Sequence, residues 1–232
     1  MIRSAIPVVP VRRRAWLSKL AACISLAALL GSCQTAYYVA AEKVGYAKRD
    51  ILTTRVKSAR DSQENAKQQI TDALTEFGKV VNYEGGDLET QYNKLAGELA
   101  QSEHAATAVH DHIANVEDVA DALFKEWDNE LDQYSSESLR AKSAQELRQT
   151  RSRYEQMIGA MHRAEDKIEP VLVPLRDQVL FLKHNLNARA IAGLKGEVAS
   201  VDKQVAQLVE ELNRSIAEAD RFIADLEKSP DA

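Results

Sequence analysis

Apolar residues recur along most of this chain at alternating spacings of four and three, and this period constrains the fold more than any other feature. A mean spacing of 3.5 residues keeps one side of an α-helix facing a partner helix, as in coiled coils and helical bundles. Two runs show the pattern most clearly, and only Ser102 and Ser215 are polar in them. Their positions are Leu88, Tyr92, Leu95, Leu99, Ser102, Ala106, Val109, Ile113, Val116, Ala120, Leu123 and Trp127, and then Leu194, Val198, Val201, Val205, Leu208, Leu212, Ser215, Ala219, Phe222 and Leu226.

Two further runs extend the pattern, and one of them crosses Pro170 and Pro174 without losing phase. Proline inside a helix removes a donor and clashes with the preceding turn. The kept phase predicts a kinked but continuous helix rather than a full break. This run is Leu147, Arg151, Tyr154, Ile158, Met161, Glu165, Ile168, Leu172, Leu175, Val179, Leu182 and Leu186; the other, which is weaker, is Leu52, Val56, Ala59, Gln63, Ala66, Ile70, Ala73, Phe77 and Val80.

Helix breakers separate the four runs. We expect turns at Gly85-Gly86, at residues 134–136 and at residues 193–196, because glycine closes helices and serine caps the next one. Short connections make neighbouring helices antiparallel. With 6% aromatic residues and only nine glycines and five prolines, the composition is typical of long helices. The predicted fold is all-α: an elongated antiparallel, coiled-coil-like bundle of about four long helices.

Charge supports the middle hairpin. Acidic residues dominate residues 116–132, and basic residues open the helix that follows. A fold about residue 136 brings Asp132 near Arg140, Glu130 near Lys142 and Asp121 near Arg151. Each exposed pair contributes well under about 1 kcal/mol, so together they select register more than they stabilise.

The first 33 residues have the plan of an export signal: a basic stretch to Lys19, an apolar run from Leu20 to Leu30, and two small residues before Cys33. The apolar run is short of the roughly 20 residues needed to span a bilayer. Leu30-Gly31-Ser32-Cys33 resembles the bacterial lipobox. That resemblance implies cleavage between Ser32 and Cys33 and lipidation of Cys33. The predicted organisation is a signal peptide over residues 1–32 and a lipid-anchored helical bundle over residues 33–232.

Two alternatives concern this leader. Leu20-Ala21-Ala22-Cys23 also fits a lipobox, but Ser18 and Lys19 leave no apolar run in front of it. Arg13-Arg14 is similar to a twin-arginine signal, a route for folded and often cofactor-loaded proteins. Because no cofactor motif follows, the ordinary export route is favoured.

The lipid and the charge predict where the protein resides and what it avoids. Several acyl chains make attachment to the membrane effectively permanent, and Gln34 in place of an aspartate favours the outer membrane, on its periplasmic face. Without residues 1–32, the chain holds 25 basic and 35 acidic residues. This acidic balance is unfavourable for binding nucleic acid.

No catalytic, cofactor-binding or metal-binding residues are predicted. His110 and His112 are two residues apart, whereas helical metal ligands stand three or four apart. The mature cysteine is expected to be acylated, and no phosphate-binding glycine loop occurs. Trp127 and Tyr154 fall in apolar seams and are expected in the core.

Residues 177–188 begin with an unusually apolar stretch in which Leu180 and Phe181 lie off the seam. This segment, Pro170-Val171-Leu172 before it and Arg153-Tyr154 earlier are similar to an uncharacterised family of Gram-negative lipoproteins, known as a domain of unknown function. The resemblance covers most of the mature chain. It implies a lipid-anchored helical protein and no activity.

These patterns predict a scaffold, spacer or adaptor of the cell envelope rather than an enzyme. Its expected partners are the membrane, through the lipid, and an unidentified envelope protein. A second copy is also possible, because a seam this long can be satisfied by another chain. The alternative is a binding module for apolar or lipid ligands, suggested by the surface near Leu180 and Phe181.

Overall fold

The structure is a computed structural model that describes residues 48–83, 85 and 87–228. The predicted signal peptide, its cleavage between Ser32 and Cys33, and the lipidated Cys33 lie outside these residues. The described chain forms helices and no strand. The helices are α3 (Lys48–Val81), α4 (Leu88–Glu130), the short 3₁₀ helix η1 (Leu131–Gln133), α5 (Glu137–Glu165), α6 (Ile168–His184) and α7 (Ala188–Lys228).

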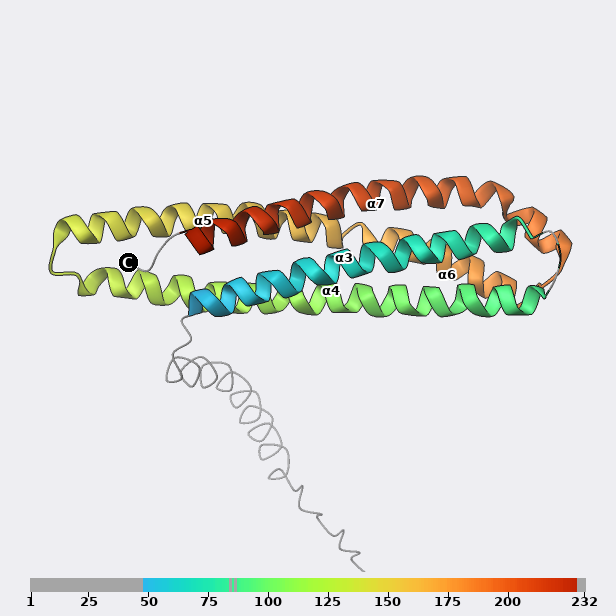
Figure 1. The fold of residues 1–232 in the computed structure, drawn as a ribbon, viewed down its shortest axis with the longest axis horizontal. Helices are drawn as coiled ribbons and strands as arrows, with labels where there is room; N and C mark the ends of the chain where they lie inside the picture. The colour runs from blue at the N-terminus through green and yellow to red at the C-terminus, as the bar shows by residue number, and fades with distance from the viewer. Residues whose placement is uncertain (1–47, 84, 86, 229–232) are drawn as a thin grey trace, which may run out of the picture. The chain divides into compact units, whose positions relative to one another are not determined.

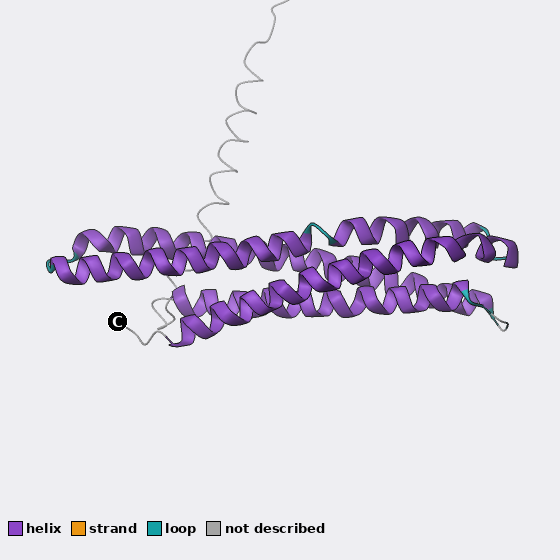
Figure 2. Cartoon of the chain, turned by 90° about the horizontal axis from the view of Figure 1, so that it is seen from above, coloured by secondary structure: helices purple, strands orange, loops and turns teal. Residues whose placement is uncertain are grey.

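The predicted all-α bundle is confirmed. Helices α3, α4 and α7 run side by side, and α5 and α6 follow one another along the fourth position (Figures 1 and 2). Successive long helices are antiparallel. The α4–α5 hairpin continues beyond the first residue of α3, where the Lys48 ammonium meets the Glu126 carboxylate at 2.9 Å. Within the described ranges, no helix is both long enough and apolar enough to cross a membrane.

The apolar stripe of α3 is completely buried, although its apolar run is the weakest in sequence. All nine predicted positions, from Leu52 to Val80, are 0% exposed. The reason is that α3 packs against both α4 and α7, so its narrow stripe is enclosed from two sides. Its three small residues Ala59, Ala66 and Ala73 fit this close approach.

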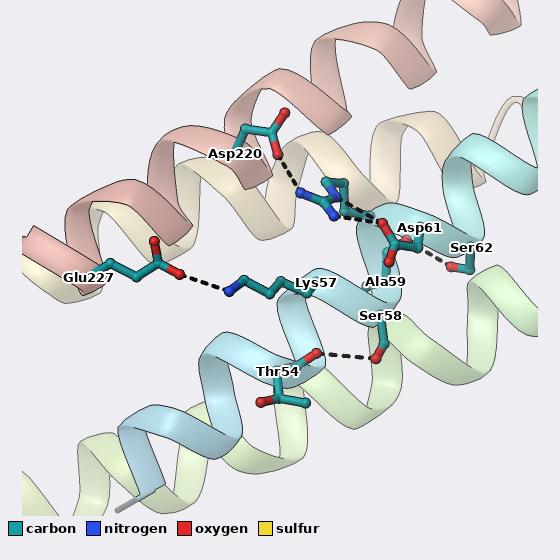
Figure 3. Close-up of polar contacts among 9 residues, drawn as sticks. Thr54, Lys57, Ser58, Ala59, Asp61, Ser62, Asp220 and Glu227 are labelled. Atoms are coloured by element: carbon teal, nitrogen blue, oxygen red, sulfur yellow. Dashed lines mark hydrogen bonds and ion pairs between the residues drawn. The ribbon is translucent and has the colours of Figure 1, made fainter.

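Polar contacts reflect the antiparallel register of α3 against α7. Lys57 Nζ lies 2.7 Å from Glu227 Oε1, and Arg60 Nη1 lies 2.8 Å from Asp220 Oδ1 (Figure 3). Residue numbers therefore rise along α3 in the direction in which they fall along α7. Deeper in the core, the buried Ser215 hydroxyl of α7 donates to Gln63 Oε1 of α3 at 2.8 Å.

The seam of α7 follows the sequence pattern, whereas that of α4 follows it only in part, since Ala106 and Leu123 are half-buried and Ala105 and Phe124 are buried instead. From Leu194 to Leu226, every predicted position is buried except Val198, which is half-buried. Tyr154 is buried as predicted, with its ring 5.4 Å from that of Phe124 and 6.3 Å from that of Phe222. Trp127 is half-buried, and its indole Nε1 donates to Ser143 Oγ at 2.9 Å.

The predicted continuity of this run is wrong at Asp166-Lys167, where the chain breaks between α5 and α6, but the helix does continue through Pro170 and Pro174 within α6. The break lies four residues before Pro170, at the carbonyl that the missing proline N–H would have bonded and that its ring crowds. Pro170 itself lies in the first turn of α6, where no N–H is needed. Pro174 is accommodated inside α6. The apolar phase survives because Ile168 and Leu172 are buried beyond the break.

The predicted turn at residues 193–196 is also wrong. Gly193 and Gly196 lie inside α7, and the turn is at residues 185–187. Asn187 determines this start, since its side-chain Oδ1 accepts from the backbone N–H groups of Arg189 at 3.1 Å and Ala190 at 3.0 Å. Asparagine is among the best N-capping residues, and it outweighs two exposed glycines that cost the helix about 1 kcal/mol each.

The middle hairpin has the predicted pairing at its tip and a different one lower down. Arg140 meets Asp132 at 3.0 Å, as predicted. Arg151 pairs with Asp128 at 2.8 Å instead of Asp121, because its guanidinium lies over the Phe124 ring, 5.2 Å from the centroid. The predicted pair of Glu130 and Lys142 is not among the ion pairs of the described residues.

Candidate functional site

The break between α5 and α6 opens a groove of about 440 Å³ against α7. Its volume lies within the range of small-molecule sites, about 300–1,000 Å³. The side-chain oxygen Oε1 of Gln204, one of the lining residues, is buried and has no hydrogen-bond partner. The groove is lined by Arg163, Asp166, Lys167, Pro170, Val171, Gln204, Gln207 and Glu211.

Charge and apolar surface are divided within this groove. Arg163 and Lys167 form no ion pair among the described residues, while Glu211 is held by Arg214 at 3.1 Å. Pro170 and Val171 add an apolar wall. The groove therefore presents two cations and an apolar wall together with the carboxylates of Asp166 and Glu211.

A network of histidines and carboxylates joins α4 to the last turns of α5. His162 Nε2 lies 2.9 Å from Glu117 Oε1, and His162 Nδ1 lies 3.1 Å from Glu165 Oε2. The other oxygen of Glu165 is 2.7 Å from His110 Nδ1. Glu165 is the last residue of α5, so the network ends at the break.

These contacts shift the protonation of both histidines. Burial disfavours the charged form of His162, but hydrogen bonds to Glu117 and Glu165 outweigh it and raise the pKa of the imidazole. The hydrogen bond to Glu165 raises the pKa of His110. We therefore expect the network to act as a proton-dependent clamp that holds α4 to α5 more firmly when the histidines are protonated. Across the described ranges, no group of three or more His, Cys, Asp or Glu residues could hold a metal ion.

Exposed apolar side chains concentrate on α6. Val173 is 41% exposed, Leu180 is 56% exposed and Phe181 is 44% exposed. The opposite face of the helix is buried through residues such as Leu172, Leu175 and Leu182. An apolar helix face directed to solvent marks a contact surface when it is clustered in this way.

The chain matches the family described as "Protein of unknown function (DUF2959)" over residues 37–226. It belongs to the DUF2959 family. The match includes all of α3 to α6 and α7 as far as Leu226, so the groove, the histidine network and the α6 surface all lie within the DUF2959 region. No curated protein matches the chain.

Sequence reasoning located only some of these features of the DUF2959 bundle. It singled out Leu180 and Phe181 as off the seam, and both are exposed. It missed Val173, the groove and the histidine network. The spacing of three between His162 and Glu165 was visible, but their partners on α4 depend on the hairpin register. The predicted functional positions, Ser32 and Cys33, are outside the described part of the chain.

Proposed function

We propose that this DUF2959 protein is an outer-membrane lipoprotein whose helical bundle serves as a scaffold, spacer or adaptor in the periplasm. The observation that carries the proposal is the sequence Leu30-Gly31-Ser32-Cys33, which resembles a lipobox and precedes a bundle of long helices. The lipid on Cys33 would supply a lasting attachment to the membrane. The bundle would supply length and surface.

The internal packing of the bundle supports a mechanical role. The stripe of α3 is wholly enclosed, and that of α7 is buried along nearly its full length. At 1.5 Å per residue, the 43 residues of α4 extend about 65 Å. A bundle with filled seams keeps its shape and presents a fixed surface to a partner, which an adaptor requires.

The proposal assigns no catalytic role to this chain. The histidine network consists of ion-paired imidazoles and carboxylates between two helices, and among the residues that the structure describes no serine hydroxyl is bonded to it. Its proposed role is to hold α4 and α5 together.

Metabolic labelling with a fatty acid tests the anchor. We expect label on the parent chain, loss of label in Cys33→Ala and full label in Cys23→Ala. The second variant is the matched control, because Cys23 ends the competing lipobox. Label retained in Cys33→Ala, or lost only in Cys23→Ala, would contradict the proposed anchor.

Crosslinking in cells followed by purification of the full chain tests the adaptor role. We expect a small set of envelope proteins to co-purify with the parent chain. The same proteins should be lost or strongly reduced with Cys33→Ala, because the bundle then leaves the membrane surface. Recovery of no protein above the background of an untagged strain would count against an adaptor.

A second candidate function, binding of an anionic amphiphile, is favoured by the groove beside Asp166-Lys167. A fluorescent fatty acid titrated into the purified protein tests it. We expect saturable binding that weakens at least fivefold when Arg163 and Lys167 are both changed to Gln. Lys195→Gln, an exposed change on α7 outside the groove, is the control. Equal binding by all three proteins would reject the groove as the site.

A further inference from the structure

The exposed face of α6 carries an ordered stripe of charge and apolar surface. Val173 and Leu180 are seven residues apart and therefore lie on the same side of the helix. Glu169 before them, Asp177 between them and His184 after them lie on the same side at spacings of three or four. All three are exposed, so the stripe faces solvent along the whole of α6.

Two copies of this stripe are complementary to each other when they lie antiparallel. It begins with an acid, Glu169, and ends with a basic residue, His184. Its two apolar residues, Val173 and Leu180, stand symmetrically about the central Arg176-Asp177. An antiparallel copy would place Val173 opposite Leu180, Arg176 opposite Asp177 and Glu169 opposite His184. Contacts between two copies related by a two-fold axis have this reciprocal form, in which each surface meets itself.

From this complementarity we propose that the outer face of α6 binds the same face of a second copy of this chain, in antiparallel orientation, with Val173 of each copy against Leu180 of the other. A parallel arrangement would instead set Glu169 against Glu169 and Asp177 against Asp177. Like charges facing each other across an interface are unfavourable. The charge order thus selects one direction.

Two of the charged groups of the stripe are free for this contact and two are already paired with each other. Asp177 and His184 form no ion pair within the described bundle, whereas Glu169 is bonded to Arg176 of the same chain. Arg176 is already positioned, because its guanidinium bonds Glu103 at 2.7 Å and Glu169 at 3.2 Å. It therefore stands at the centre of the stripe with a fixed orientation. Asp177 of the second copy would add a third carboxylate to the same cation.

The size of α6 sets the strength of the association. Its 17 residues span about 25 Å, and one helix from each copy buries less than the roughly 1,200 Å² of a standard stable interface. The dimer is accordingly a weak one that forms at high local concentration. It involves only α6, so it does not depend on acylation of Cys33 and survives if the proposed anchor is wrong.

Disulfide trapping between two differently tagged full-length chains tests the proposal. One chain carries Val173→Cys, the other carries Leu180→Cys, and cells that express both are treated with a mild oxidant. We expect the mixed pair to cross-link at least tenfold more than either variant with itself. Like positions would be offset by seven residues, about 10 Å along the helix, which exceeds the reach of a disulfide.

Two controls make the result decisive. Ser200→Cys, exposed on α7, replaces either partner and should give only the background of the parent chain. Asp177→Arg, added to both members of the mixed pair, should reduce the cross-link severalfold, because two cations would then meet at the centre. Equal cross-linking in all combinations, or none in the mixed pair, overturns the proposal. Protection of both cysteines from a water-soluble maleimide without a cross-link overturns it too, since the face would then be covered by a lipid or another protein.

Discussion

The hydroxyl of Ser215 on α7 donates a hydrogen bond of 2.8 Å to the side-chain oxygen of Gln63 on α3, and both residues are 0% exposed. The amide nitrogen of Gln63 reaches the carbonyl of Met161 on α5 at 3.5 Å. One polar layer therefore joins three helices inside an otherwise apolar seam. Such a layer makes one register of the helices better than its neighbours, since a slip would strand these groups without partners.

Ser215→Ala should lower the free energy of unfolding by about 1–3 kcal/mol, the cost of a buried polar group left without a partner. Urea denaturation followed by circular dichroism measures it. Gln63→Leu combined with Ser215→Ala should restore much of the loss, because both polar partners are then removed. A Ser215→Ala protein as stable as the parent would show that the layer contributes nothing.

The histidine network predicts a pH-dependent stability. Hydrogen bonds to Glu117 and Glu165 hold the pKa of His162 above its ordinary value of about 6.5, so the folded chain binds this proton more tightly than the unfolded chain. The stabilisation that these hydrogen bonds provide is fully present below pH 6.5 and is lost as the pH rises through the raised pKa of His162. The urea midpoint should therefore fall between pH 6 and pH 8.5, and His162→Gln should flatten that dependence.

His104→Gln is the control for this experiment, because His104 is exposed on α4 and forms no ion pair in the described structure. Its midpoints should follow those of the parent at every pH. A parent protein that is equally stable at pH 6 and pH 8.5 would rule out the clamp.

Gly193→Ala and Gly196→Ala should each stabilise the protein by about 0.5–1 kcal/mol. Both glycines are exposed inside α7, an added Cβ meets nothing within 4 Å, and alanine favours helix by about this amount. Thermal unfolding monitored at 222 nm provides the measurement. The opposite sign would place a turn at these glycines after all.

Asn187→Ala should destabilise the protein. Its free energy of unfolding should fall by about 0.5–2 kcal/mol, because the change removes the cap that starts α7. Asn187→Ser, which keeps a capping oxygen, should recover most of that loss. If alanine and serine are equivalent at this position, the cap does not determine where α7 begins.

The ion pairs between α3 and α7 should contribute little to stability (Figure 3). Arg60 and Asp220 meet at 2.8 Å, but the aspartate side chain is 54% exposed. Exposed pairs of this kind are worth about 0.2–1 kcal/mol. A double-mutant cycle with Arg60→Gln and Asp220→Asn should give a coupling energy in that range, smaller at 1 M salt. A coupling above 2 kcal/mol would identify the pair as a main stabilising contact.

The sequence by itself determined which residues face the core. The alternation of four and three marks Leu52 to Val80 on α3 and Leu194 to Leu226 on α7. These positions are buried except for the half-buried Val198, because only one side of each helix faces the core and the apolar spacing specifies which side that is. The number of long helices and their antiparallel order follow from the same stripes and the short turns between them. Leu180 and Phe181 stood out as off the seam for the same reason, and the structure shows that they are exposed.

Only the tertiary structure decided where the helices end and which side chains meet across them. The apolar phase kept across the two prolines could not locate the break at Asp166-Lys167. The two glycines of α7 were stronger turn signals in the sequence than the cap at Asn187. A helix end depends on which backbone groups find hydrogen-bond partners. The pairing of Arg151 with Asp128 and of His162 with Glu117 depends on long side chains from separate helices. A periodic pattern fixes the face of a helix, whereas a contact between helices also requires their relative shift, which is set by packing.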